Sequence, residues 1–267
     1  SHRPRRGDGA MTLAAHDLSL SLGRRPVLHR IDFAARPGTL TAIVGPNGSG
    51  KTTLLRALTG ELAAERRVTL DGRALEDWPP AALARRRAVL PQSVTLAFPF
   101  TVLEIVKLGC EVRGVSGDTP ALDALAAVGL AAHVGRPCQQ LSGGEQQRAQ
   151  LARVLAQVGG PSGVEGPNWL LLDEPVSALD IGHQLAVMRL ARDFAAGGGG
   201  VVAVMHDLNL TAMFADRVVL MESGRLAAEG APAEVLTSDR LSQVYACPLQ
   251  VGKAPAEGPF ILPQSAA

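Results

Sequence analysis

Short, uninterrupted apolar runs and longer amphipathic segments alternate along the chain. Buried strands are predicted where such runs occur, at residues 39–44, 88–91, 169–172 and 201–205. Uninterrupted runs are typical of parallel strands that helices cover on both faces. Residues 13–22 alternate loosely, and Asp71-Gly72 is a dipeptide that favours hairpin turns. These features predict a small antiparallel sheet beside the first buried strand.

Helical spacing of apolar residues dominates the middle of the chain. Thr101 and Glu104 have the Thr-x-x-Glu spacing of a capping box, which predicts a helix start. Amphipathic helices are predicted over residues 121–130, 144–158 and around 184–194. The Gly/Pro-rich stretch 159–168 is expected to be a linking loop without regular structure. The pattern as a whole predicts an α/β fold whose core is interrupted by a helical subdomain.

Composition and charge exclude several classes of protein. The 267 residues are 46% hydrophobic and 19% charged with a formal net charge of +1, which indicates a globular chain and does not favour a nucleic-acid partner. The arginine groups 24–25, 66–67 and 85–87 are expected on solvated faces. The cysteines lack C-x-x-C spacing, which argues against a zinc site or a disulfide framework. Apolar runs stay shorter than the ~18 residues of a membrane span, and the start lacks a signal-peptide pattern.

A glycine-rich segment directly follows the first predicted strand. It matches G-x-x-x-x-G-K-[ST] with Gly45, Pro46, Asn47, Gly48, Ser49, Gly50, Lys51 and Thr52, followed by Thr53. Glycines let backbone N–H groups converge on phosphate oxygens at a helix N-terminus. Lys51 is expected to neutralise the β- and γ-phosphates, and the Thr52 hydroxyl to ligate Mg²⁺. The motif therefore predicts a nucleoside triphosphate site.

Acidic and imidazole side chains follow two later strands. Asp173 and Glu174 end the run LLLDE, and His206 ends VVAVMH. Because ligands bind at the carboxyl ends of strands in an open parallel sheet, we expect all three beside the phosphate site. Asp173 is expected to hold the Mg²⁺ shell, Glu174 to polarise an attacking water and His206 to reach the γ-phosphate. Two adjacent acids also suit a helix start, an alternative that the nearby P-loop makes weaker.

A second glycine-containing segment, LSGGEQ, begins at Leu141. Ser142 and Glu145 have capping-box spacing, so a helix start accounts for both of them. It does not account for Gly143 and Gly144, which are poor helix residues unless a ligand approaches the backbone closely. The segment therefore predicts a second anion site at a helix N-terminus.

These segments together resemble the ATP-binding subunits of ABC transporters over nearly the whole chain. The matches, in family order, are the P-loop, Gln92 as the Q-loop, LSGGEQQR as the signature, LLLDE as the Walker B segment, Ser177-Ala-Leu-Asp180 as the D-loop and His206 as the switch histidine. The resemblance implies ATP and Mg²⁺ as ligands and ATP hydrolysis as the activity. It implies that Glu174 is the catalytic base, that Gln92 senses Mg²⁺ and the water, and that Lys51 and His206 contact phosphate.

In this family two ATP-binding domains pack head to tail, and the resemblance implies a homodimer. Ser142, Gly143 and Gly144 of one copy would contact the ATP held by the P-loop of the other, and Asp180 would couple the two sites. The implied partners are two transmembrane permease subunits and, indirectly, a periplasmic binding protein, with no nucleic acid. The implied location is peripheral, on the cytoplasmic face of the inner membrane.

Pattern and resemblance together predict the fold class and its divisions. The class is α/β, a P-loop NTPase core with a RecA-like parallel sheet and an antiparallel β subdomain, plus an inserted helical subdomain. Residues 1–10 would be an extension before Met11, and 11–267 a single domain. The predicted divisions are a core (11–92 and 166–240), a helical signature subdomain (93–165) and a C-terminal tail (241–267).

The cargo is predicted from resemblance alone. LPQSVTLAFPFTVLEIVKLG and MHDLNLTAMFADRVVLMESGRLAAEGAPAEVLT resemble ATPases of iron-siderophore, haem and cobalamin importers, and AFPFTV with the short tail after VYACPL is most similar to the haemin-importer ATPases. An apolar lead into the helix capped by Thr101 explains AFPFTV equally well. Siderophore and cobalamin import remain alternatives, as does a soluble ABC ATPase of iron–sulfur assembly. A stand-alone P-loop kinase would leave LSGGEQ without a purpose.

One position departs from the family pattern. These domains commonly carry an aromatic residue before the P-loop that stacks on adenine. The corresponding segment LSLSLGRRPVL offers Leu20 and Leu22, and Tyr245 is the sole tyrosine of the chain. The sequence therefore predicts apolar packing on the base in place of aromatic stacking.

Overall fold

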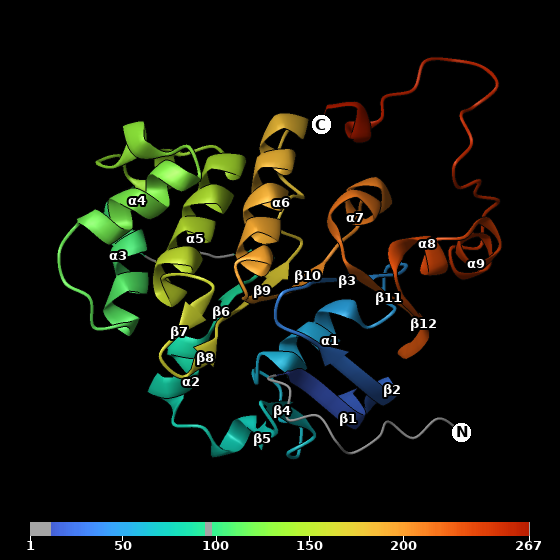
Figure 1. The fold of residues 1–267 in the computed structure, drawn as a ribbon, viewed down its shortest axis with the longest axis horizontal. Coiled ribbons are helices and arrows are strands. Elements are labelled where there is room, and N and C mark those ends of the chain that lie inside the picture. Colours follow the sequence, from blue (N-terminus) through green and yellow to red (C-terminus); the bar gives the residue numbers. More distant parts are fainter. Residues whose placement is uncertain (1–11, 94–97, 267) are drawn as a thin grey trace.

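A six-stranded sheet forms the centre of the molecule, whose computed structural model describes residues 12–93 and 98–266 (Figure 1). The strand order is β12-β11-β3-β10-β9-β6. The strands are β3 Leu40–Val44, β6 Arg87–Leu90, β9 Trp169–Asp173, β10 Gly200–Val204, β11 Arg217–Glu222 and β12 Arg225–Gly230. All neighbours pair in parallel except β11 and β12. The buried strands predicted from the apolar runs are thus confirmed as the middle and one edge of this sheet.

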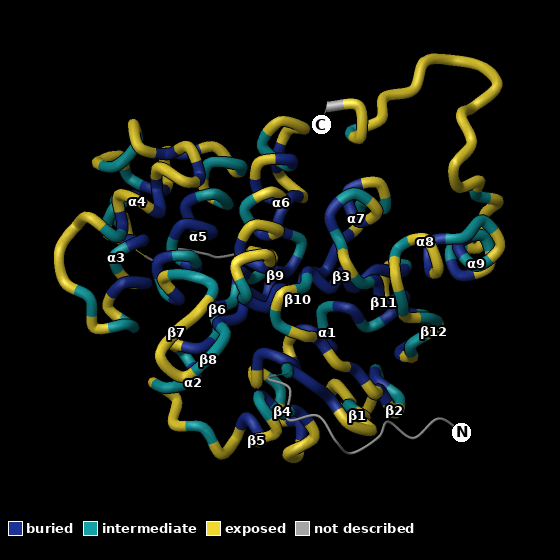
Figure 2. Tube along the Cα trace, in the orientation of Figure 1, coloured by how far each residue is buried: buried dark blue, intermediate teal, exposed yellow. Residues whose placement is uncertain are grey.

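Side chains of the central strands alternate between two hydrophobic clusters, as the period of two in a strand requires. In β3, Leu40, Ala42 and Val44 belong to one cluster and Ile43 to the other. Figure 1 shows α6 (Ile181–Ala196) and α7 (Leu208–Phe214) on one side of the sheet and α1 (Lys51–Leu58) on the other. Figure 2 shows the resulting buried centre. Every residue of β3, β9 and β10 is buried, which explains their uninterrupted apolar sequences.

A second sheet, entirely antiparallel, packs over α1. Its order is β2-β1-β4-β5, with β1 Leu13–Leu22, β2 Arg25–Ala35, β4 Val68–Leu70 and β5 Arg73–Ala74. Asp71 and Gly72 join β4 to β5 with φ angles of 54° and 77°, the left-handed conformation of a tight hairpin turn. The predicted antiparallel sheet and its turn are confirmed.

Three helices lie together beside the central sheet. They are α3 Val102–Val112, α4 Thr119–Ala127 and α5 Gly143–Val158. The Thr101 side chain accepts a hydrogen bond from Glu104 N, and Glu104 bonds back to Thr101 N, so the predicted capping box is confirmed. A Cβ on Gly109 of α3 would lie 2.2 Å from Arg153 O of α5, so α3 and α5 approach closely at this point.

The prediction of an unstructured loop over residues 159–168 is wrong. Strands β7 (Ser162–Gly163) and β8 (Gly166–Pro167) pair there as a short antiparallel hairpin. Arg86, from the distant α2 (Pro80–Arg86), donates hydrogen bonds to Glu165 O at 2.8 Å and Pro167 O at 3.2 Å. This long-range support is invisible in the local sequence. The predicted subdomain boundary between residues 165 and 166 falls inside the hairpin, and the domain divisions stay a prediction.

Arg86 also contradicts the expectation that the arginine groups are solvated. It is 3% exposed and pairs with Asp71 Oδ2 at 2.6 Å.

The remaining helices are α8 Pro232–Val235 and α9 Ser238–Val244, with 3-10 turns at Leu75–Asp77, Ala131–His133, Cys138–Gln140 and Pro263–Ala266. Within the described residues, no helix is long and apolar enough to cross a membrane.

Candidate nucleotide site

The glycine-rich loop between β3 and α1 has three glycines in backbone conformations that residues with side chains rarely adopt. Gly45, Gly48 and Gly50 have φ angles of 148°, 78° and 100°. A Cβ on Gly45 would lie 2.2 Å from Met221 O. Helix α1 begins at Lys51 without a side-chain cap and without an acidic residue in its first turn. Its first N–H groups therefore lack side-chain partners and suit an anion.

Lys51 lies folded against this loop. Its side chain donates hydrogen bonds from Nζ to Gly45 O at 2.9 Å and Pro46 O at 3.0 Å, and the residue is 6% exposed. Burial lowers the pKa of Lys51, while the nearby carboxylates of Glu174 and Asp173 act in the opposite direction. The site therefore holds an ammonium group beside two carboxylates, at the carboxyl ends of the central strands.

Asp173, the last residue of β9, faces the first turn of α1. Thr52 Oγ1 lies 3.4 Å from Asp173 Oδ1, a long hydrogen bond. Burial first, and then the charge of Glu174, raises the pKa of Asp173 to about 6. A buried carboxylate next to a hydroxyl is an oxygen donor set of the kind that Mg²⁺ prefers. Among the described residues no group of three or more His, Cys, Asp or Glu could hold a metal alone, so phosphate oxygens and water would supply other ligands.

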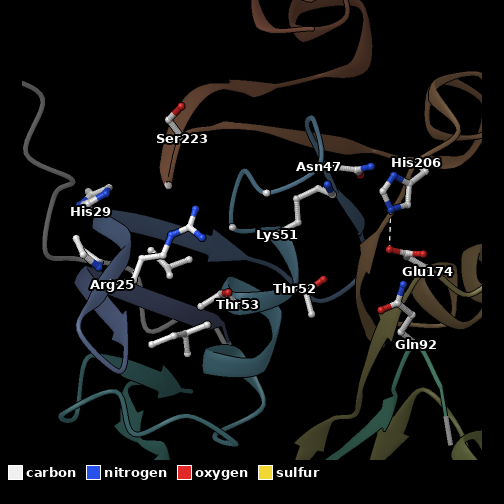
Figure 3. A pocket seen from close by; sticks show the side chains of 16 residues that line it. Arg25, His29, Asn47, Lys51, Thr52, Thr53, Gln92, Glu174, His206 and Ser223 are labelled. Carbon is white, nitrogen blue, oxygen red and sulfur yellow. Dashed lines mark hydrogen bonds and ion pairs between the residues drawn. The ribbon is translucent and has the colours of Figure 1, made fainter.

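Glu174 and His206 form a pair at the ends of neighbouring strands (Figure 3). His206 Nε2 lies 2.6 Å from Glu174 Oε1, and the side chains are 44% and 14% exposed respectively. Glu174 has a φ angle of 51°, and its N–H donates to Val204 O at 3.1 Å. The turn of the backbone after β9 directs the Glu174 carboxylate toward His206. Both side chains line the same pocket as Lys51 and Thr52.

That pocket has a volume of about 1020 Å³ and brings together residues from distant parts of the chain. Its phosphate end is lined by Asn47, Gly48, Gly50, Lys51, Thr52, Thr53, Gln92, Glu174 and His206. In Figure 3, the labelled Gln92 side chain lies close to Glu174. Of the residues predicted for the P-loop and the reaction centre, those that do not line this pocket are Gly45, Pro46, Ser49 and Asp173.

The residues of the LSGGEQ segment lie elsewhere. Ser142, Gly143 and Gly144 do not line this pocket. Ser142 caps α5 through the predicted capping box, with Glu145 N donating to Ser142 Oγ at 3.3 Å and Ser142 N to Glu145 Oε2 at 2.7 Å. Asp180 likewise lies outside the pocket and caps α6, accepting a hydrogen bond from His183 N at 2.9 Å. Within one chain the two predicted anion sites are therefore separate.

The far end of the pocket contains residues that the sequence alone did not single out. They are Arg25, Pro26, Val27, His29, Ser223 and Gly224, together with the predicted Leu22. Leu20 was expected beside Leu22, but it packs against the hydrophobic cluster of the antiparallel sheet. Regular alternation along β1 would place Leu20 and Leu22 on the same face, but the pairing of β1 with β2 is irregular between Leu18 and Ser21 and breaks that period.

The turn between β11 and β12 closes this far end. Ser223 and Gly224 have φ angles of 47° and 77°. Gly224 N donates to Ser49 O, and His29 N donates to Gly224 O, both at 2.9 Å. The turn thus joins β2 to the phosphate loop. The Ser-Gly dipeptide signals a turn in the sequence, but nothing local indicates that the turn lies against the P-loop.

The site has the features of a P-loop nucleotide-binding protein. These features are a buried lysine in a glycine loop, an acidic residue at a strand end and an open pocket on a parallel sheet. The family model described as ABC transporter matches residues 28–177, more than half of the chain. The chain belongs to this family, and it has the ATP-binding domain of such transporters. The predicted family and the predicted fold class are confirmed.

Relatives of known name support the same assignment. The chain is 58% identical to the hemin import ATP-binding protein HmuV of Ruegeria sp. (strain TM1040), over 96% of this chain and 99% of that protein. It is 56% identical to the protein of the same name from Rhizobium meliloti (strain 1021), over 95% and 99% respectively. A solved ATP-binding subunit of an ABC transporter matches with a TM-score of 0.73 at 22% identity, covering 90% of this chain and 95% of that one. The last likeness concerns the fold alone.

Proposed function

We propose that this chain hydrolyses MgATP and powers the import of haemin through an ABC transporter. The observation that carries the hydrolytic part is the Glu174–His206 pair, 2.6 Å apart, which faces the pocket bordered by Lys51 and Thr52. The cargo is proposed from the curated relatives, whose names specify hemin import. Their matches run over almost the full length of both chains, so the proposal concerns the whole domain.

The phosphate end would bind and orient the nucleotide. Lys51 and the free N–H groups at the start of α1 would bind the β- and γ-phosphates. Thr52, Asp173 and Gln92 would hold Mg²⁺, which neutralises phosphate charge when it is bound. Displacement of the Lys51 ammonium from Gly45 O and Pro46 O toward phosphate would exchange neutral acceptors for charged ones, which strengthens its hydrogen bonds.

Glu174 would act on the attacking water. Its carboxylate would accept the proton that water loses as the water oxygen bonds to the γ-phosphorus and the bond to the β–γ bridging oxygen breaks. His206 would hold that carboxylate in place through Nε2 and would contact the γ-phosphate. Gln92, at the same end of the pocket, would orient the water together with the metal.

A second copy of the chain would complete each site. The signature residues Ser142, Gly143 and Gly144 do not line the pocket of their own chain, so we infer that they contact the nucleotide of another copy. Asp180, exposed at the start of α6, would lie at the interface between copies. Two transmembrane permease subunits would bind the dimer on the cytoplasmic face of the inner membrane, and a periplasmic binding protein would deliver haemin to them.

Two experiments test these two parts. The full-length chain should hydrolyse MgATP, and Glu174→Gln should abolish turnover while it retains an ATP-dependent dimer. A variant that stays monomeric with MgATP would contradict the two-copy site.

Deletion of the gene in its own organism should abolish growth on haemin as sole iron source and spare growth on ferric siderophores and on cobalamin. Loss on one of the latter instead would reassign the cargo, and unchanged growth on all would favour a soluble ABC ATPase of iron–sulfur assembly.

A further inference from the structure

The backbone of Glu174 is held in a conformation that residues with side chains rarely adopt. Its φ angle is 51°, in the left-handed region. Such a conformation persists only where the surroundings fix it. Local bonds contribute, because Ser177 donates to Glu174 O from its N–H at 3.3 Å and from its Oγ at 3.2 Å. These bonds come from within the same short turn, so they cannot by themselves anchor that turn to the rest of the protein.

Gln147 supplies an anchor from a different element. It is the seventh residue of the LSGGEQQR segment and lies in α5, about one turn after Ser142, Gly143 and Gly144. Gln147 Nε2 donates to Glu174 O at 2.9 Å, and Gln147 Oε1 accepts from Ala178 N at 3.3 Å. Both contacts require the same orientation of the amide, since a flipped amide would oppose donor to donor and acceptor to acceptor. A single side chain therefore spans the turn from Glu174 to Ala178.

The start of α5 also packs directly on this turn. A Cβ built on Gly144 would lie 3.1 Å from Ala178 O and 3.1 Å from Leu179 Cδ2. The contact leaves little space between the helix and the segment after Glu174. The signature end of α5 is thus fastened to the Glu174 segment by close packing at Gly144 and by two hydrogen bonds at Gln147.

We propose that Gln147 is a positioning residue for the catalytic glutamate, and that it links Glu174 to the helix that begins at the signature. The inference rests on the proposed role of Glu174 in ATP hydrolysis. Gln147 is absent from the lining of the nucleotide pocket, so it acts through Glu174 and not on the nucleotide. Because the start of α5 would contact the partner's ATP, occupancy of that second site would reach Glu174 through Gln147.

The first test compares two variants of Gln147 with a matched control on the same helix. Gln147→Ala removes both bonds, and Gln147→Glu keeps an acceptor for Ala178 N but loses the donor to Glu174 O. We expect both to lower kcat for MgATP by the order of 10- to 100-fold, as misplaced catalytic groups do, with KM within about twofold of wild type. Gln157→Ala is the control, because that amide bonds Ala84 O and Arg87 O away from the pocket and should leave kcat unchanged.

The second test separates positioning from folding and from nucleotide capture. In the Glu174→Gln background, Gln147→Ala should still form the ATP-dependent dimer at the same MgATP concentration. Loss of that dimer, a raised KM with unchanged kcat, or a kcat equal to that of wild type would each overturn the inference. A melting temperature that falls further than in Gln157→Ala, together with lost activity in both Gln147 variants, would indicate a structural role instead. A wild-type chain without ATPase activity would overturn the proposed function and this inference with it.

Discussion

His206 Nε2 lies 2.6 Å from Glu174 Oε1, although the two residues are 32 positions apart and belong to different strand ends. Strands β9 and β10 are neighbours with Asp173 opposite Val204, so the residues that follow them emerge side by side. The short distance results from this parallel register and from the left-handed backbone of Glu174. The pair is the clearest sign of chemistry in the pocket.

Removal of the imidazole should slow hydrolysis. We expect His206→Ala to lower kcat for MgATP by the order of 10²-fold, because the Glu174 carboxylate loses the group that holds it. Steady-state kinetics of the full-length chain measures the effect. His16→Ala serves as the control, since His16 is an exposed residue of β1 that does not line the pocket. A His206→Ala variant with wild-type kcat would show that the pair has no part in turnover.

Neutralising Asp173 should stabilise the nucleotide-free chain in a pH-dependent way. The pKa of Asp173 is raised from 3.8 to about 6 in the folded chain, so the folded state binds this proton more tightly than the unfolded state does. The stabilisation that this bound proton gives the folded state is therefore fully present below pH 3.8 and is lost as the pH rises through about 6. Solvent in the open pocket weakens the effect, and we expect Asp173→Asn to gain about 1 to 2 kcal/mol at pH 7.5.

Thermal unfolding without nucleotide or Mg²⁺, at pH 7.5 and at pH 4, measures this difference. The melting temperatures of Asp173→Asn and wild type should differ at the higher pH and converge at the lower one. The same variant should need more Mg²⁺ for half-maximal ATPase activity, because an amide replaces the carboxylate ligand. Equal melting temperatures at both values of pH would contradict the raised pKa.

Two turn glycines with similar φ angles should respond differently to alanine. Gly23 has a φ angle of 61° and nothing within 4 Å of a built Cβ, so Gly23→Ala should cost only the backbone strain of about 1 kcal/mol. At Gly224 the φ angle is 77° and the Cβ would lie 2.1 Å from Val27 O. Gly224→Ala should therefore cost about 2 kcal/mol more, as overpacking does.

Gly224→Ala should also weaken ATP binding, since it would break the turn away from Ser49 of the phosphate loop. Denaturant unfolding gives the two stability changes, and a nucleotide titration gives the dissociation constants. Equal stability losses in the two variants would mean that the turn at Gly224 moves freely and does not support the loop.

An aromatic residue at the far end of the pocket should tighten nucleotide binding. Leu22 is 46% exposed and lines the pocket, where the described lining residues include no Phe, Tyr or Trp. Leu22→Tyr should lower the dissociation constant for ATP about fivefold or more, because base stacking on an aromatic ring contributes about 1–3 kcal/mol. Val164→Tyr, at the exposed tip of the β7–β8 hairpin, is the control. Unchanged affinity in Leu22→Tyr would place the base elsewhere in the pocket.

Sequence patterns predicted the features that depend on neighbours along the chain. The P-loop, the Asp71-Gly72 turn and the capping boxes at Thr101 and Ser142 all form as expected. Each depends on backbone geometry and on hydrogen bonds within a few residues, which the local sequence specifies. The apolar runs likewise predicted which strands are buried, because burial on both faces leaves few polar positions, here Thr41 and Asp173.

Only the tertiary structure decided which distant groups meet. It paired His206 with Glu174, buried Arg86 under the β7–β8 hairpin, set the Ser223–Gly224 turn against Ser49 and joined Gln147 to the Glu174 turn. It also separated Leu20 from Leu22 and left Ser142 outside the pocket of its own chain. These relationships depend on strand order, register and the packing of α5. No short window of sequence contains these hydrogen bonds, because they join residues that are far apart along the chain and meet in space only when the sheet is assembled.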